Sequence, residues 1–122
     1  MTLRKNNILT DFDTSKVSWL KSGGNIDKLL KINTESDLRT ISKDIDYKNG
    51  ILPIGNFSNL LIREKGYSGT AIKLIGDFSK IHVEKDFLLV GAGVLDSFFS
   101  QYCYRNSITG YEFLHTIPGS VG

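Results

Sequence analysis

The residues best suited to chemistry form a short polar loop between two apolar runs. Gly55, Asn56, Ser58 and Asn59 surround one bulky residue, Phe57. Small, amide-bearing and hydroxyl-bearing residues can turn successive backbone N–H groups toward an anion, and their side chains add hydrogen bonds to phosphate oxygens. The same residue types dominate ordinary turns, so the loop is either a phosphate-binding nest or a strand–turn–strand corner.

A second candidate lies at the end of the sequence, where residues 110–122 read GYEFLHTIPGSVG. Proline fixes one backbone angle there, and glycine permits conformations that are closed to other residues. Small residues also allow a large ligand to approach the main chain. Because such a segment normally has further chain after it, we expect the sequence to be the front part of a larger protein.

A glycine pair, Gly91 and Gly93, follows an apolar run and precedes an expected helix. Gly-x-Gly begins the dinucleotide-binding fingerprint, but Asp96 stands where that fingerprint needs its third glycine. We therefore interpret this pair as a strand-to-helix turn.

The remaining reactive side chains predict neither a metal site nor a nucleophile. His82 and His115 are far apart in the sequence and have no partner cysteines, so they lack the spacing of metal ligands. Cys103 falls on the apolar face of an expected helix and is interpreted as a buried packing residue. As the only cysteine, it also excludes an internal disulfide framework.

Length and composition suit one domain, or part of one. The 122 residues carry a net charge of +2, and the basic residues are spread out without forming a block for nucleic acid. No apolar run is long enough to cross a bilayer, and the N-terminus lacks the apolar core of a signal peptide. We therefore expect a cytoplasmic protein that binds neither nucleic acid nor membranes.

The elements that must position these residues are short strands and two helices, an α+β pattern. Residues 1–16 are expected to form a loose arm. A first small lobe is expected over residues 17–75, and residues 76–122 are expected to begin a second, truncated lobe. The expected strands are residues 17–20, 28–32, 51–54, 60–62, 70–75 and a hairpin of 81–84 with 87–90.

Each expected helix has an apolar face. The first begins at Thr34, which can form a capping box with Asp37, and continues along a narrow apolar stripe to Ile45. The second ends near Asn106, and its apolar face is predicted to carry Leu95, Phe98, Phe99, Tyr102 and Cys103. The continuous apolar run 87–90 is predicted to be buried on both faces.

Three segments, taken in order, resemble one family, the UDP-N-acetylmuramate dehydrogenases (UDP-N-acetylenolpyruvoylglucosamine reductases). Residues 18–25 (SWLKSGGN) resemble its T-W-F-K-x-G-G opening. Residues 55–62 (GNFSNLLI) resemble its G-x-G-S-N-L-L-I loop, and residues 110–122 resemble its G-x-E-F-L-x-G-I-P-G-S-V-G segment. The resemblance extends over nearly all of residues 17–122.

The resemblance implies an FAD-binding fold of the vanillyl-alcohol oxidase type, built of two small α/β lobes. It implies that FAD accepts a hydride from NADPH and passes it to UDP-N-acetylglucosamine enolpyruvate, giving UDP-N-acetylmuramate for peptidoglycan synthesis by an enzyme expected to be a monomer. It also implies two sets of cofactor-binding residues. They are Gly55, Asn56, Phe57, Ser58, Asn59 and Leu60 at the pyrophosphate, and Ile117, Pro118, Gly119, Ser120, Val121 and Gly122 further along the flavin.

Two positions depart from the family pattern. Phe57 stands in place of the second loop glycine, where a side chain adds bulk and penalises a positive φ angle. We expect this residue to weaken flavin binding and the substitution Phe57→Gly to tighten it. Thr116 stands where glycine usually precedes I-P, which predicts a milder form of the same effect.

The family's catalytic residues would all lie beyond Gly122, so no residue of this chain is predicted to be catalytic. We therefore expect the sequence to be an N-terminal fragment of the reductase that is inactive alone. Two alternatives remain open at this point: a non-catalytic flavin- or nucleotide-binding protein, or a fragment of another FAD-linked oxidoreductase of the same superfamily.

Overall fold

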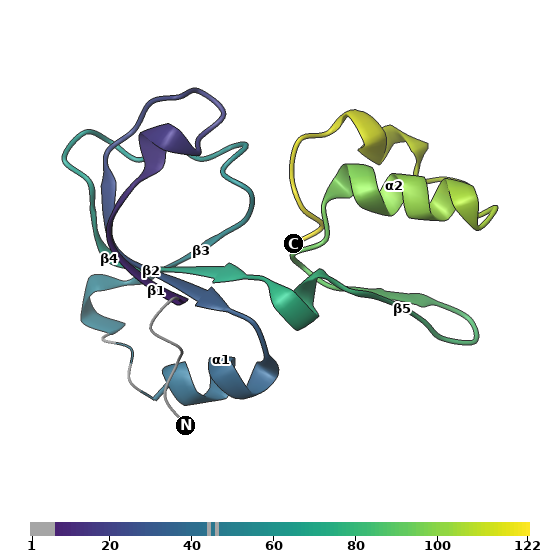
Figure 1. Ribbon diagram of the computed structural model, residues 1–122, viewed down its shortest axis with the longest axis horizontal. Helices are drawn as coiled ribbons and strands as arrows, with labels where there is room; N and C mark the ends of the chain where they lie inside the picture. The colour runs from purple at the N-terminus through teal and green to yellow at the C-terminus, as the bar shows by residue number, and fades with distance from the viewer. Residues whose placement is uncertain (1–6, 44, 46) are drawn as a thin grey trace.

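In the computed structural model, which describes residues 7–43, 45 and 47–122, the chain forms two lobes side by side (Figure 1). The first lobe contains a four-stranded sheet, and the second contains a two-stranded sheet with the longer helix. A 3₁₀ turn, η4 (Gly76–Ser79), joins them. The predicted α+β fold class is confirmed.

The first sheet has the strand order β1-β2-β4-β3. Its strands are β1 (Ile8–Asp13), β2 (Asn25–Ile32), β3 (Ile51–Ile54) and β4 (Tyr67–Leu74). β1 is antiparallel to β2, whereas β2, β4 and β3 run parallel to one another. The carboxyl ends of these three parallel strands therefore meet at one edge of the sheet.

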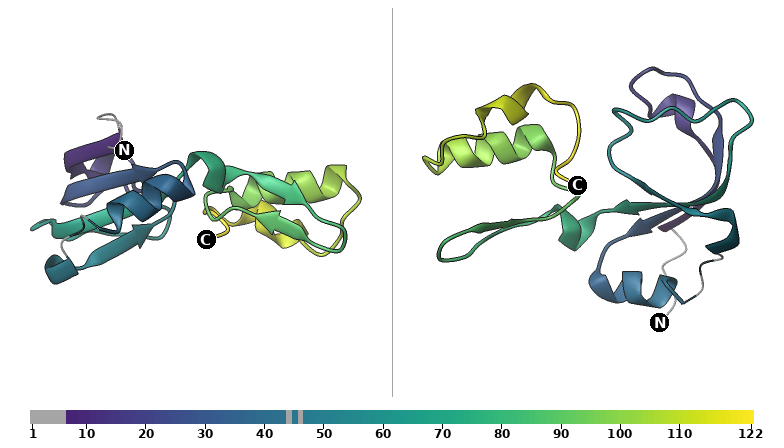
Figure 2. Two further views of the ribbon diagram at one scale, coloured as in Figure 1. Left: turned by 90° about the horizontal axis from the view of Figure 1, so that it is seen from below. Right: turned by 180° about the vertical axis from the view of Figure 1, so that it is seen from behind.

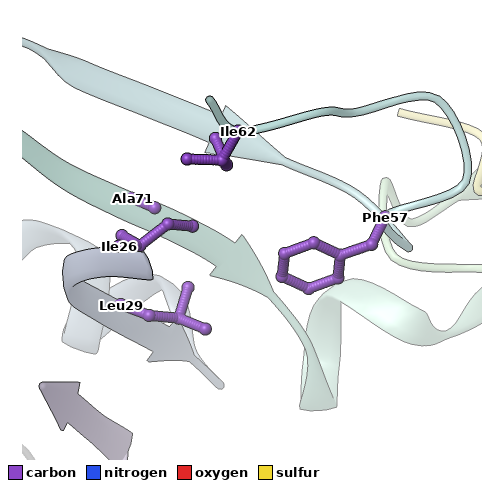
Figure 3. Packing of buried hydrophobic residues seen from close by; sticks show 5 residues of the cluster. All are labelled: Ile26, Leu29, Phe57, Ile62 and Ala71. Atoms are coloured by element: carbon purple, nitrogen blue, oxygen red, sulfur yellow. The ribbon is translucent and has the colours of Figure 1, made fainter. Parts of the chain in front are cut away.

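Alternation along the strands gives this sheet two apolar faces. One face packs against α1 (Glu35–Ile41) through a cluster of Leu30, Ile32 and Ile41. The other face is covered by the loops that precede β2 and β4 (Figures 1 and 3). Its buried residues are Ile26, Leu29, Phe57, Ile62 and Ala71.

The predicted start of the first helix is confirmed in detail. The hydroxyl oxygen of Thr34 accepts a hydrogen bond from the backbone N–H of Asp37, at 3.1 Å, and the Asp37 carboxylate accepts one from the backbone N–H of Thr34, also at 3.1 Å. These two bonds satisfy N–H groups that would otherwise lack partners at the helix N-terminus.

The second lobe is a hairpin with a helix packed on it. The hairpin is β5 (Ile81–Val83) with β6 (Leu88–Val90), as predicted, and the helix is α2 (Asp96–Arg105) with its C-cap at Asn106. Its core is Val94, Phe99 and Cys103, so Cys103 is the buried packing residue that was expected. A short 3₁₀ helix, η5 (Glu112–Thr116), packs against α2.

Other expectations for this lobe were wrong. The run 87–90 is not buried on both faces, since Leu89 is 57% exposed in a sheet of only two strands. Leu95 and Phe98 are also exposed, because the apolar face of α2 is narrower than the sequence suggested and centres on Phe99 and Cys103.

Three expectations for the first lobe were also wrong. Residues 1–16 were expected to form a loose arm, but residues 8–13 pair with β2 and residues 14–16 form a 3₁₀ turn, η2 (Thr14–Lys16); residues 1–6 lie outside the described part of the chain. Residues 17–20 and 60–62 are turns and loop rather than strands. Ile62 is buried without joining the ladder of backbone hydrogen bonds, whereas the apolar side chains of residues 17–20 are exposed.

Candidate functional site

The first two segments that carry the family resemblance lie against each other in space. The backbone N–H of Trp19 donates to the carbonyl of Phe57 at 3.2 Å, and the N–H of Gly24 donates to the carbonyl of Ile62 at 2.9 Å. The hydroxyl of the buried Thr14 also donates to the carbonyl of Gly24, at 2.7 Å. Residues 18–25 are therefore hydrogen-bonded to the middle of the polar loop, at Phe57, and to the segment that follows it, at Ile62.

The second and third segments also meet. A Cβ atom added at Gly55 would lie 3.0 Å from the Ser120 hydroxyl oxygen, and one added at Gly119 would lie 3.6 Å from the Ser58 hydroxyl oxygen. The absence of a side chain at Gly55 is therefore what allows the loop after β3 to approach the last residues so closely. Three segments that are far apart in the sequence form one region.

The third segment is held in place by the turn that precedes α2. The N–H groups of Val121 and Gly122 donate to the carbonyls of Val94 and Ala92 at 2.9 and 3.0 Å, and the N–H of Asp96 donates to the carbonyl of Gly119 at 3.2 Å. These bonds place the end of the chain between the two lobes (Figure 2). The second lobe thus presents residues 119–122 to the polar loop of the first.

Two pockets flank the polar loop. One, of about 450 Å³, lies between the lobes and is lined on the first lobe by Gly55, Asn56 and Lys73, and on the second by Ser120 and Gly122. The other, of about 680 Å³, lies on the face of the first sheet. Its lining includes Trp19, Lys21, Lys31, Asn56, Phe57, Ser58, Lys73 and Pro118. Both volumes suit a small-molecule ligand.

Phe57 has the backbone conformation of a glycine, but its ring turns inward and does not project from the loop. Its φ angle is +57°, the left-handed conformation that favours glycine. Its ring, however, is only 6% exposed and points into the core beside Leu29 and Ala71 (Figure 3). The ring is therefore directed away from the surface of the loop, whereas the positive φ angle that glycine favours is present; the effect of Phe57 on flavin binding remains a prediction.

The structure separates the predicted site residues into two groups. Seven line one or both pockets: Gly55, Asn56, Phe57, Ser58, Pro118, Ser120 and Gly122. Asn59, Leu60, Ile117, Gly119 and Val121 line neither, although Gly119 supports the segment through its bond to Asp96. The assignment of these residues to a cofactor remains a prediction.

The glycine pair 91 and 93 is a tight turn between β6 and α2, as interpreted from the sequence. A Cβ atom added at either glycine would overlap the main chain of Phe78 or Leu74, so both are needed for close backbone packing.

Within residues 7–43, 45 and 47–122, no three His, Cys, Asp or Glu side chains gather as metal ligands. In the same part of the chain no helix has the length and apolar character to cross a membrane.

The sequence pattern did not predict the three lysines that line the larger pocket, Lys21, Lys31 and Lys73. Lys31 on β2 and Lys73 on β4 are register partners, and both line the larger pocket with Lys21. Desolvation lowers the pKa of Lys73, and the charge of Lys31 lowers it further. The signal that would have revealed this pair is the parallel pairing of β2 with β4, which cannot be read from either strand alone.

Similarity to known proteins extends over nearly the whole chain. It is 35% identical over 112 residues to the UDP-N-acetylenolpyruvoylglucosamine reductase of Rickettsia prowazekii and 36% identical over 112 residues to that of Rickettsia felis, which is 92% of this chain in each case. The chain is homologous to the UDP-N-acetylenolpyruvoylglucosamine reductases. It spans 38% of the length of these relatives.

The solved structures agree with this homology. The crystal structure of UDP-N-acetylenolpyruvylglucosamine reductase (MurB) from Thermus caldophilus superposes with a TM-score of 0.74 at 28% identity, covering 94% of this chain and 39% of that one. No family model matches the chain. The resemblance to this reductase family that was inferred from three segments is confirmed.

Proposed function

We propose that this chain is the flavin-binding part of an NADPH-dependent reductase that converts UDP-N-acetylglucosamine enolpyruvate to UDP-N-acetylmuramate. Such an enzyme serves peptidoglycan synthesis in the cytoplasm, and we propose that it acts as a monomer. The observation that carries the proposal is the meeting of the three reductase-like segments around two pockets. Segments that were quoted only for their sequence pattern are neighbours in space.

The geometry suits FAD in three respects. The polar loop follows β3 at the carboxyl edge of parallel strands, a common location for ligands in such sheets. Two pockets lie on either side of this loop, which gives an elongated ligand room to extend across it. Gly55 allows the main chain of this loop to lie close to the Ser120 hydroxyl, so that both lobes can contact one ligand.

Bound FAD would supply the hydride transfer, which none of the twenty side chains performs. The residues of this chain would bind and orient it: Asn56 and Ser58 offer polar atoms on the first lobe, and Ser120 offers a hydroxyl on the second. As the family resemblance implies, we propose that the residue that donates a proton to the enolpyruvyl carbon is not among those of this chain.

The proposal is tested by titrating the purified chain with FAD and following flavin fluorescence. Binding by the chain is expected. Asn56→Ala should weaken binding because Asn56 lines both pockets, whereas Asn49→Ala, an exposed asparagine outside both pockets, should not. A folded chain that does not bind FAD would refute the proposal.

A second measurement concerns activity. NADPH oxidation that depends on the enolpyruvyl substrate should be absent in the chain alone if, as proposed, the proton donor is not among its residues. Substrate-dependent oxidation by the purified chain would show that catalytic residues are among those described here.

A further inference from the structure

A third pocket lies in the second lobe, between α2 and η5. η5 packs against α2 (Figure 1), and the pocket there has a volume of about 690 Å³. Its lining residues come from α2, from residues 107–109 and from η5, and none of them lines either pocket beside the polar loop. The volume suits a small-molecule ligand, so the second lobe offers a place for a ligand that is separate from the proposed flavin region.

The floor of this pocket combines an apolar surface with one buried hydroxyl. Cys103 and Ile108 line it and belong to the core of the lobe. Ser100 also lines it and is only 7% exposed. A serine or threonine within a helix often donates to the carbonyl four residues earlier, as Thr40 does to Ser36. Within the described part of the chain, the Ser100 hydroxyl has no such partner.

This hydroxyl opens into the pocket. No fully enclosed polar side-chain atom among the described residues lacks a hydrogen-bond partner, so the unpartnered oxygen of Ser100 must reach open space, and the pocket is the space that it lines. Leaving a buried hydroxyl without a partner costs free energy. A ligand that displaces water from this pocket must therefore offer Ser100 a polar atom.

The rim of the pocket carries a negative charge. Glu112 is its one lining carboxylate, and neither Lys nor Arg is among the lining residues, although the imidazole of His115 lies on the same rim. The backbone N–H of Gly110 donates to Oε2 of Glu112 at 2.9 Å, which orients the carboxylate. Burial raises the pKa of the Cys103 thiol, and the charge of Glu112 raises it further, so the field of this carboxylate reaches the floor.

The end of α2 adds to this negative potential. Cys103 and Tyr104, from the last turn of α2, line the pocket, and the C-terminus of a helix carries a partial negative charge that attracts cations. The ring of Tyr104 is 84% exposed and offers an aromatic face to an ammonium group. The carboxylate, the helix terminus and the aromatic ring all favour a positively charged ligand.

We propose that the pocket between α2 and η5 binds a small organic cation, a primary amine whose apolar body carries a second polar group. The ammonium group donates to the Glu112 carboxylate beside Tyr104, and the apolar body packs on Cys103 and Ile108. The second polar group pairs with the Ser100 hydroxyl. This inference goes beyond the proposed flavin function and does not depend on it.

The test is an NMR titration of the isotopically labelled chain with four probes that differ in one group at a time. Tyramine carries an amine and a phenolic hydroxyl, phenethylamine lacks the hydroxyl, 4-ethylphenol lacks the amine, and 3-(4-hydroxyphenyl)propionate replaces the amine by a carboxylate. At about pH 8 an ordinary imidazole is neutral, so the carboxylate dominates the charge of the rim. Tyramine should bind tightest and the propionate weakest, with shifts centred on residues 100–115.

Glu112→Gln removes the charge and keeps an oxygen that can accept from Gly110. It should weaken tyramine binding by about tenfold, because a charge-assisted hydrogen bond is lost, and leave 4-ethylphenol binding unchanged. Glu84→Gln is the matched control, since Glu84 is an exposed glutamate of the same lobe outside this pocket. It changes the net charge equally and should not alter tyramine affinity.

Ser100→Ala tests the floor of the pocket. It should weaken the binding of tyramine and leave that of phenethylamine unchanged, because only tyramine has a hydroxyl for Ser100 to pair with. Urea midpoints of all variants verify that they are folded.

Several results would overturn the cation site. They are an affinity for tyramine no greater than that for 4-ethylphenol, an equal loss in Glu84→Gln, no binding of tyramine by the folded chain, or shifts confined to residues 55–60 and 117–122. The proposed function is judged separately. A chain that binds tyramine here but does not bind FAD would support the cation site and refute the flavin function.

Discussion

Substitutions of Phe57 should show whether the packing of its buried ring contributes more to the free energy of unfolding than its left-handed backbone conformation costs. Phe57 is 6% exposed, packs with Ile26, Leu29 and Ala71, and lies 5.8 Å from the Phe12 ring, centre to centre. Truncating a buried phenylalanine to alanine costs about 3–5 kcal/mol of stability. The variant Phe57→Ala loses this packing and still keeps a side chain at a φ of +57°.

The glycine variant should be the more stable of the two. A non-glycine residue in the left-handed region costs about 1–2 kcal/mol, and Phe57→Gly relieves this cost. We therefore expect Phe57→Gly to be about 1 kcal/mol more stable than Phe57→Ala, the reverse of the usual order of these residues. Both variants should be less stable than the parent chain, because the lost packing exceeds the relieved strain.

Urea unfolding followed by circular dichroism measures all three chains. The reasoning fails if Phe57→Gly is less stable than Phe57→Ala, or if either variant lies within about 1 kcal/mol of the parent, which would mean that the ring contributes little to the core. The same variants give a second result. Since the ring holds Lys73 beside the loop, Phe57→Gly should weaken FAD binding and not tighten it, contrary to the expectation from sequence.

Three further predictions concern other parts of the chain. Thr34→Ala should lower the free energy of unfolding by about 1 kcal/mol because it removes the capping box, and Ser36→Ala, exposed in the same helix, serves as the control in urea unfolding. Heteronuclear NMR should place the pKa of Lys73 below that of an ordinary lysine, and Lys31→Met should raise it. Because the unfolded chain then binds more protons, the contribution of Lys73 to stability should increase as the pH rises through its folded pKa, and Lys73→Met should remove this increase. Cys103 is 1% exposed, and the pKa of its thiol is raised mainly by burial and further by the charge of Glu112. It should therefore react with Ellman's reagent only at the rate of unfolding. Rapid reaction in the native chain would contradict its burial.

Local signals in the sequence predicted the elements that depend on local chemistry. The capping box at Thr34, the hairpin around residues 85–86 and the helix end at Asn106 each involve residues close in the chain, so their patterns could be read directly. The prediction of a strand over residues 60–62 was wrong because an apolar side chain such as that of Ile62 can reach the core from a loop as well as from a strand. The pairing of residues 8–13 with β2 was missed because an edge strand with a mixed polar pattern resembles a loop.

The candidate site was only partly predictable. The polar loop and residues 117–122 stand out by composition and by family pattern, and the structure brings both to the same pockets through Gly55, Asn56 and Ser120. Lys31 and Lys73 do not stand out, because each is one lysine among many until the register of two parallel strands makes them neighbours. The inward turn of Phe57 also depends on tertiary packing, which no local pattern records.

The parallel pairing of β2 with β4 also determines when the site comes into existence. Lys31 and Lys73 are 42 positions apart, and the sequence between them includes α1 and β3. Bringing the two lysines together therefore requires closure of a long loop. The hairpin and α2 rely on contacts between residues near in sequence and can form early and quickly. We therefore expect the site, which needs the pairings of the first sheet and the docking of residues 119–122, to form late in folding. A ligand that binds there would then favour the completely folded chain over partly folded forms.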